Sequence, residues 1–112
     1  MEKYLNIWKF LKNRFEFFKQ KTALVCGSER ISYAQLTEIV EQGGKQRKIL
    51  PVLEGSLAEQ AISILKGLRR ENIVVPLNKA YGENYCQNIL SELEKHNAND
   101  MDSDIALILF TS

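Results

Sequence analysis

The sequence predicts an α/β fold with a largely parallel, twisted sheet and flanking helices. From residue 48 onward, short apolar runs alternate with amphipathic stretches long enough for right-handed crossovers between parallel strands. The last run, residues 105–110, is apolar at every position, which is typical of a strand covered on both faces. Ligands of such sheets bind beyond the carboxyl ends of the strands.

Composition indicates one small domain or one piece of a larger one. The chain has 112 residues, of which 45% are hydrophobic and 26% charged, as in ordinary globular proteins. The net charge of +1 gives no reason to expect a nucleic-acid partner. Cys26 and Cys86 are read as reduced thiols of a cytoplasmic protein, because a secreted disulfide scaffold would use more cysteines.

Residues 3–19 are predicted to form an amphipathic helix, and residues 21–112 the α/β part of a single partial domain. Tyr4, Ile7, Trp8, Leu11, Phe15 and Phe18 follow one stripe at helical spacing, while Leu5, Phe10 and Phe17 lie off it. Residues 1–21 carry a net charge of +4, which leaves −3 for the remainder. We expect this helix to pack on its own protein or on a protein partner, in preference to a membrane surface.

The next elements are a β-hairpin and a capped helix. Residues 22–26 and 30–32 are predicted strands on either side of a turn. Ser32 and Gln35 have the spacing of a capping box, and the helix that they start is predicted to end by Gly43 and Gly44.

Strands and helices then alternate to the end of the chain. Pro51 removes a ladder donor, so it is expected on an edge strand or at the end of a strand. Ser56 and Glu59 predict a second capping box, and Asn72 is expected to take the left-handed conformation that closes the following helix. The predicted strands are residues 48–53 and 73–75, and residues 96–103 form a loop. One predicted helix begins after Ser56 and has an inward stripe that starts at Leu57. Another spans 83–95 and places four residues inward: Tyr85, Ile89, Leu90 and Leu93.

Few side chains could carry catalysis. His96 is the single histidine and lies in a polar stretch that predicts an exposed position. One histidine and two distant cysteines give no metal-ligand spacing, so neither catalytic nor metal-binding residues are predicted. Lys66, Arg69 and Arg70 are expected to complement the dipole of their helix. Thr111 and Ser112 follow the last strand, where a phosphate-binding loop would begin.

Four stretches resemble the N-terminal part of the adenylate-forming enzymes: acyl-CoA synthetases, adenylation domains of non-ribosomal peptide synthetases, and luciferases. They are residues 22–27, residues 31–36, residues 65–66 with 73–78, and residues 105–112. The third resembles a helix ending in Leu-Lys-x-Gly before a strand ending in Val-Pro-Leu-Asp or Asn. The fourth resembles the strand that leads into Thr-Ser-Gly-Thr-Thr-Gly-x-Pro-Lys. A glycine expected near Glu71 or Asn72 is missing, and an extra strand–helix unit before the last strand is absent.

The resemblance implies an incomplete part of the larger adenylate-forming N-terminal domain. Such enzymes use ATP and Mg²⁺ to convert a carboxylic acid into an acyl-adenylate, and then pass the acyl group to coenzyme A or a carrier-protein thiol. Of the ATP loop, the 112 residues include Thr111 and Ser112 as cofactor-binding candidates. We therefore expect the chain by itself to bind no cofactor and to be inactive.

Other interpretations stay open from sequence. The chain could instead be a non-catalytic α/β module that binds a partner protein through helix 3–19. A fragment of an amino-acid-activating adenylation domain fits the same motifs as an acyl-CoA synthetase. The acid cannot be chosen from these residues.

Overall fold

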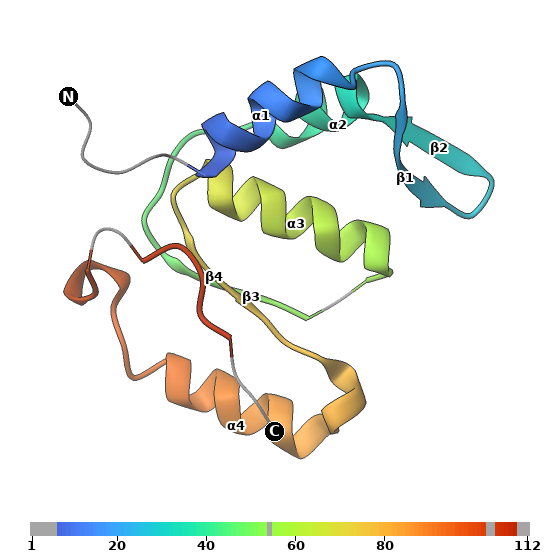
Figure 1. Cartoon of the computed structure of the whole chain (residues 1–112). Coiled ribbons are helices and arrows are strands. Elements are labelled where there is room, and N and C mark those ends of the chain that lie inside the picture. Colours follow the sequence, from blue (N-terminus) through green and yellow to red (C-terminus); the bar gives the residue numbers. More distant parts are fainter. Residues whose placement is uncertain (1–6, 54, 103–104, 110–112) are drawn as a thin grey trace.

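A computed structural model describes residues 7–53, 55–102 and 105–109 as stacked layers (Figure 1). Helices α1 (Ile7–Phe17) and α2 (Tyr33–Val40) form the outermost layer, and α3 (Leu57–Arg69) lies beneath them. Next comes the parallel pair β3 (Ile49–Val52) and β4 (Ile73–Pro76), with α4 (Glu83–Leu93) on its other face. The chain is therefore mixed α/β, as predicted.

Helix α1 belongs to the core, because its inner stripe packs on α2 and α3. Trp8 forms a buried cluster with Leu36 and Val40, and Leu11 and Phe15 pack against this cluster. The Trp8 and Phe15 rings meet edge to face, with 5.8 Å between their centroids, a preferred aromatic geometry. The predicted stripe is confirmed for these residues, whereas Ile7 is 44% exposed. Tyr4 and Leu5 lie outside the described residues.

The predicted hairpin is confirmed, but it forms a sheet of its own. Strands β1 (Thr22–Cys26) and β2 (Glu29–Ser32) pair antiparallel and do not join β3 and β4. The Ser32 capping box is complete: the Gln35 amide donates to Ser32 Oγ at 3.1 Å, and the Ser32 amide donates to Gln35 Oε1 at 2.9 Å. Helix α2 ends at Val40, before Gly43 and Gly44, as predicted.

Helix α3 lies between the sheet and the outer helices, so its side chains are partly buried on several sides. The Glu59 amide donates to Ser56 Oγ at 3.2 Å, while the Glu59 carboxylate accepts from the Ser56 hydroxyl at 3.3 Å. Ser56 therefore caps the helix through one half of the predicted box. Leu57, at the helix start, is 84% exposed, which contradicts its predicted inward position.

Close packing of α3 on the sheet depends on Gly67. A Cβ at this position would lie 2.6 Å from Val74 Cγ2 and 2.9 Å from Leu50 Cδ2. Glycine therefore allows the helix to approach β3 and β4 more closely than any other residue would.

The turn between α3 and β4 corrects one prediction. Glu71, with φ of 66°, takes the left-handed conformation expected of Asn72. The Asn72 amide instead donates to Gly67 O at 2.9 Å, and its side chain is buried and donates to Gln46 O. Asn72 is needed as a buried donor, so the strained backbone position falls on Glu71.

Strands β3 and β4 run parallel in the register Ile49↔Ile73 to Val52↔Pro76. The Ile73 amide donates to Lys48 O at 2.8 Å and the Leu77 amide to Val52 O at 2.8 Å. Within the described chain β3 has no second neighbour, which confirms the edge position expected from Pro51.

Helix α4 covers the second face of the sheet. Ile89 and Leu93 form a buried cluster with Val75 and Leu77, and Tyr85 and Leu90 pack against it, as predicted. A 3₁₀ turn (Ala98–Asp100) lies within the predicted loop. No helix among the described residues is long and apolar enough to cross a membrane.

Residues 105–109 lie beside β4 in parallel orientation, joined by a single bridge, Val74↔Leu107. The Val74 amide donates to Ala106 O and the Ile108 amide to Val74 O, each at 2.9 Å. The expected full burial is wrong: Leu107 is 46% and Leu109 68% exposed. The segment is the outer neighbour of β4 in the described chain, so one edge of it stays uncovered.

Candidate functional site

The candidate site is the end of the sheet where the carboxyl ends of three parallel chain segments lie. Residues 105–109 and β3 flank β4, and all three run in the same direction. Their carboxyl ends therefore lie at the same end of the sheet, where ligands of parallel sheets bind. Thr111 and Ser112, the predicted cofactor-binding residues, lie outside the described residues.

The side chains that directly follow β4 at this end of the sheet have structural roles. Leu77 is buried in the core. Asn78 Oδ1 accepts from the Ala80 amide at 2.9 Å and so caps a 3₁₀ turn (Lys79–Tyr81). The Cys86 thiol lies 3.7 Å from Asn78 O. These contacts fix the chain after β4.

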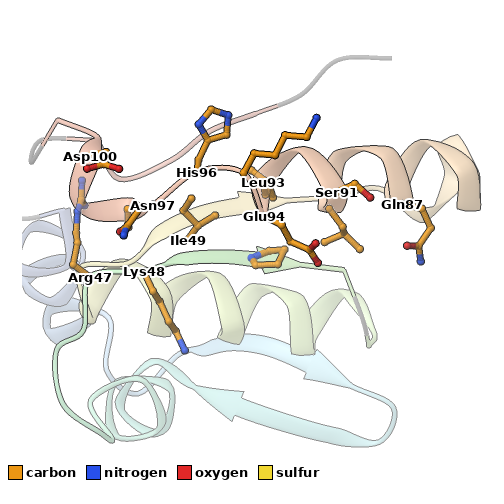
Figure 2. A pocket seen from close by; sticks show the side chains of 14 residues that line it. Arg47, Lys48, Ile49, Gln87, Ser91, Leu93, Glu94, His96, Asn97 and Asp100 are labelled. Atoms are coloured by element: carbon orange, nitrogen blue, oxygen red, sulfur yellow. The ribbon is translucent and has the colours of Figure 1, made fainter.

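A hollow of about 710 Å³ lies elsewhere, along β3 and the C-terminal half of α4 (Figure 2). Arg47, Lys48 and Ile49, at the start of β3, line it together with His96 and Asn97. These residues put the hollow toward the amino ends of the strands, whereas ligands of such sheets bind at the carboxyl ends. His96 and Lys48 point away from each other in Figure 2, so their side chains do not converge on one point.

A second hollow of about 420 Å³ also borders β3. Pro51 and Leu90 line both hollows, and Ser63, Lys66 and Arg70 line the second alone. The two hollows thus follow the unpaired edge of β3, and neither is an enclosed ligand cavity. This geometry fits a sheet edge that another part of a protein covers.

His96 is on the surface, as predicted. Its Nε2 lies 3.7 Å from Glu92 Oε1, and Lys95 Nζ lies 3.2 Å from Glu92 Oε2. The hydrogen bond and charge of Lys95, followed by the weaker effect of His96, lower the pKa of the Glu92 carboxyl. Solvent screens this exposed trio, and no nucleophile of the described part of the chain is bonded to it.

Arg47 is the residue that sequence reasoning missed. Its guanidinium donates to Asp102 O at 2.6 Å, to Ile105 O at 2.8 Å and to Glu71 O at 3.4 Å. The partners are backbone carbonyls more than fifty residues away in two of three cases. No local spacing could reveal such contacts, because a carbonyl leaves no signature in the sequence.

The basic residues at the end of α3 lie in its last turn, as predicted, and they also make contacts that were not predicted. Arg69 donates to Gly43 O, and Arg70 Nη2 donates to Gln42 O at 3.1 Å. They hold the loop before β3, in addition to lying where the helix dipole favours cations.

In the part of the chain that the structure describes, no group of three metal-ligating side chains occurs. Both cysteines are free, Cys26 half-buried and Cys86 buried. No protein-family model matches the chain, and no curated protein matches it.

Proposed function

We propose that this chain is the N-terminal part of an ATP-dependent, AMP-forming carboxylic acid–thiol ligase of the acyl-CoA synthetase type. One observation supports the proposal above others. Two of the motifs that resemble the adenylate-forming family contain neighbouring parallel segments. They are residues 73–78, which include β4, and residues 105–109. Their carboxyl ends consequently face one edge, as an ATP-binding site at that edge requires.

The proposed reaction has two steps. A substrate carboxylate attacks the α-phosphate of ATP, forming an acyl-adenylate and releasing pyrophosphate. A thiol of coenzyme A or a carrier protein then attacks the acyl carbon, and AMP leaves. Mg²⁺ and loop amides would offset the phosphate charge, with Thr111 and Ser112 as the first residues of that loop. A cytoplasmic enzyme would agree with the two free cysteines.

The first test is the messenger sequence after the codon for Ser112. We expect the frame to continue as Gly-Thr-Thr-Gly-x-Pro-Lys. A stop codon at that point would contradict the ligase proposal.

The second test is activity of the protein that this frame encodes. We expect release of pyrophosphate and trapping of an acyl hydroxamate by hydroxylamine, with a panel of carboxylic acids and ATP. The 112-residue chain, assayed in parallel, should do neither. Absence of adenylate formation by the folded longer protein with every acid would argue against the proposal.

A second candidate function is a non-catalytic module that binds a protein partner through α1. Phe10 and Phe17 are 60% and 79% exposed, on the face opposite to Trp8 and Phe15. Exposed aromatic residues two helical turns apart are typical of a helix that contacts another surface. Capture of one partner by the wild-type chain, lost in Phe10→Ser/Phe17→Ser, would favour this function. Trp8 must stay intact in that variant, because it holds the fold.

A further inference from the structure

The segment 105–109 has a register that its own residues do not specify. Its sequence is Ile-Ala-Leu-Ile-Leu, apolar on both faces. Ile108 packs against the cluster of Val75, Leu77, Ile89 and Leu93, while Leu107 and Leu109 are exposed. A slip of one residue would exchange these faces, and would bury leucine in place of isoleucine at little cost.

The pairing with β4 is also too short to fix the register. The described segment has one bridge, through Val74 and Leu107, and two backbone hydrogen bonds. By contrast, β3 and β4 pair at four consecutive positions. Another contact must therefore distinguish between the registers.

Arg47 makes that contact. Its Nη2 donates to Asp102 O at 2.6 Å and its Nη1 to Ile105 O at 2.8 Å. The planar fork thus holds two carbonyls at the start of the segment, and hydrogen bonds from a charged donor are stronger than neutral ones. After a slip of one residue these carbonyls would no longer meet both nitrogens.

The backbone at Arg47 is itself held in place. The Gln46 amide donates to Arg70 O at 2.9 Å, and the buried Asn72 side chain donates to Gln46 O. Nη1 of Arg47 also reaches Glu71 O at 3.4 Å. The guanidinium therefore projects from a loop anchored to the end of α3, which makes it a fixed reference point for the segment.

We infer that Arg47 is a positioning residue that sets the register of residues 105–109 on β4. The register determines where Leu109 lies along β4. If the proposed ligase function is correct, Arg47 thereby positions the start of the ATP phosphate loop without touching ATP. The inference about register stands on the contacts alone, and its consequence for ATP rests on the proposed function.

Amide hydrogen exchange of the full chain, followed by NMR, tests the register. The reporters are the amides of Val74 and Ile108, which bond across this pairing, and those of Ile73 and Leu77, which bond β4 to β3. In Arg47→Met we expect exchange of the Ile108 amide to accelerate about tenfold or more. The net free energy of a hydrogen bond from a charged donor changes the local opening equilibrium by roughly a factor of ten or more. Val74 should follow Ile108, and Ile73 and Leu77 should change less than about threefold.

Arg69→Met is the matched control. Arg69 also bonds a carbonyl of the loop before β3, Gly43 O, and no bond from it to residues 102–109 occurs among the described contacts. We expect all four amides to keep their exchange rates in this variant. Unchanged Ile108 exchange in a folded Arg47→Met protein would overturn the inference.

If Arg47→Met unfolds and all four amides exchange quickly, Arg47→Lys tests whether Arg47 sets the register. Lysine keeps the charge and loses the fork. Selective acceleration of Ile108 in this variant supports the inference, and full protection overturns it.

In the longer enzyme, Arg47→Lys should raise the KM for ATP more than it lowers kcat. A wild-type protein that forms no adenylate would refute the ligase function, while the exchange rates would still decide the register.

Discussion

Strand β4 and the segment 105–109 are both runs of apolar residues, yet they differ in how deeply they are buried. In β4, Ile73, Val74 and Val75 are 0% exposed, with α3 on one face and α4 on the other. The segment 105–109 lies directly beside β4, but its two leucines are 46% and 68% exposed. Composition is similar in the two, so burial here depends on position within the sheet.

Different contacts hold β4 and the segment 105–109 in place. Strand β4 has neighbours at both edges, so backbone pairing and two covered faces fix it together. Among the described residues, the segment 105–109 has β4 as its one neighbour, and it depends on a side chain, Arg47, from a distant loop. Edge segments with such sparse pairing are the parts of a sheet in which register is weakly specified.

A carboxylate should have very different effects on stability in β4 and in the segment 105–109. Val75→Asp buries a carboxylate in the core and should cost about 4 kcal/mol or more in the free energy of unfolding. Leu109→Asp faces solvent and should cost less than about 1 kcal/mol. Urea unfolding followed by circular dichroism measures both, and similar losses in the two variants would contradict the contrast.

A smaller effect is expected from the packing of α3 on β4. Gly67→Ala brings a methyl group against Val74 and Leu50, and strain should outweigh the gain in helix propensity by about 1–2 kcal/mol. Gly44→Ala is the control, because its Cβ would meet nothing within 4 Å. A Gly67→Ala protein as stable as Gly44→Ala would show that the sheet and helix can separate without cost.

The turn that leads into β4 offers a stabilising change. Glu71→Gly relieves a left-handed conformation and should raise the free energy of unfolding by about 0.5–1 kcal/mol. It also removes the exposed ion pair with Lys45, 3.3 Å apart, which is worth little at a surface. Lys45→Met measures that loss separately, and a Glu71→Gly protein less stable than Lys45→Met would disprove the strain.

The smallest expected effect is at Glu92, on the exposed side of α4. Because Lys95 lowers its pKa, its stabilising contribution is present above the ordinary glutamate pKa and is lost as pH falls through the lowered value. Glu92→Gln should lower Tm by no more than about 1–2 °C at pH 7, and by nothing at a pH below both values. Thermal scans at the two pH values check this, with Lys95→Met expected to show the same loss.

Much of the local structure could be predicted from short-range chemistry. Ser32 with Gln35 marked the start of α2, Pro51 marked an edge strand, and the spacing of Ile89 and Leu93 marked the inner face of α4. Each of these signals acts within a few residues, so it can be read in the sequence. The left-handed residue was misplaced by one position, because the choice between Glu71 and Asn72 depends on Gln46, which lies far away in the chain.

Most helices and strands could be predicted from the sequence, because periodicity and capping are properties of neighbouring residues. The predicted strand at residues 105–110 is an exception, since its described part makes a single bridge. The sequence also carried the motifs that resemble adenylate-forming enzymes, a likeness that stays a proposal. Only the tertiary structure decided that β1 and β2 form a separate sheet and that residues 105–109 are half exposed. It alone brought Arg47 to the carbonyls of Asp102 and Ile105. Such contacts join distant segments through backbone atoms, which every residue has, so no pattern of side chains announces them.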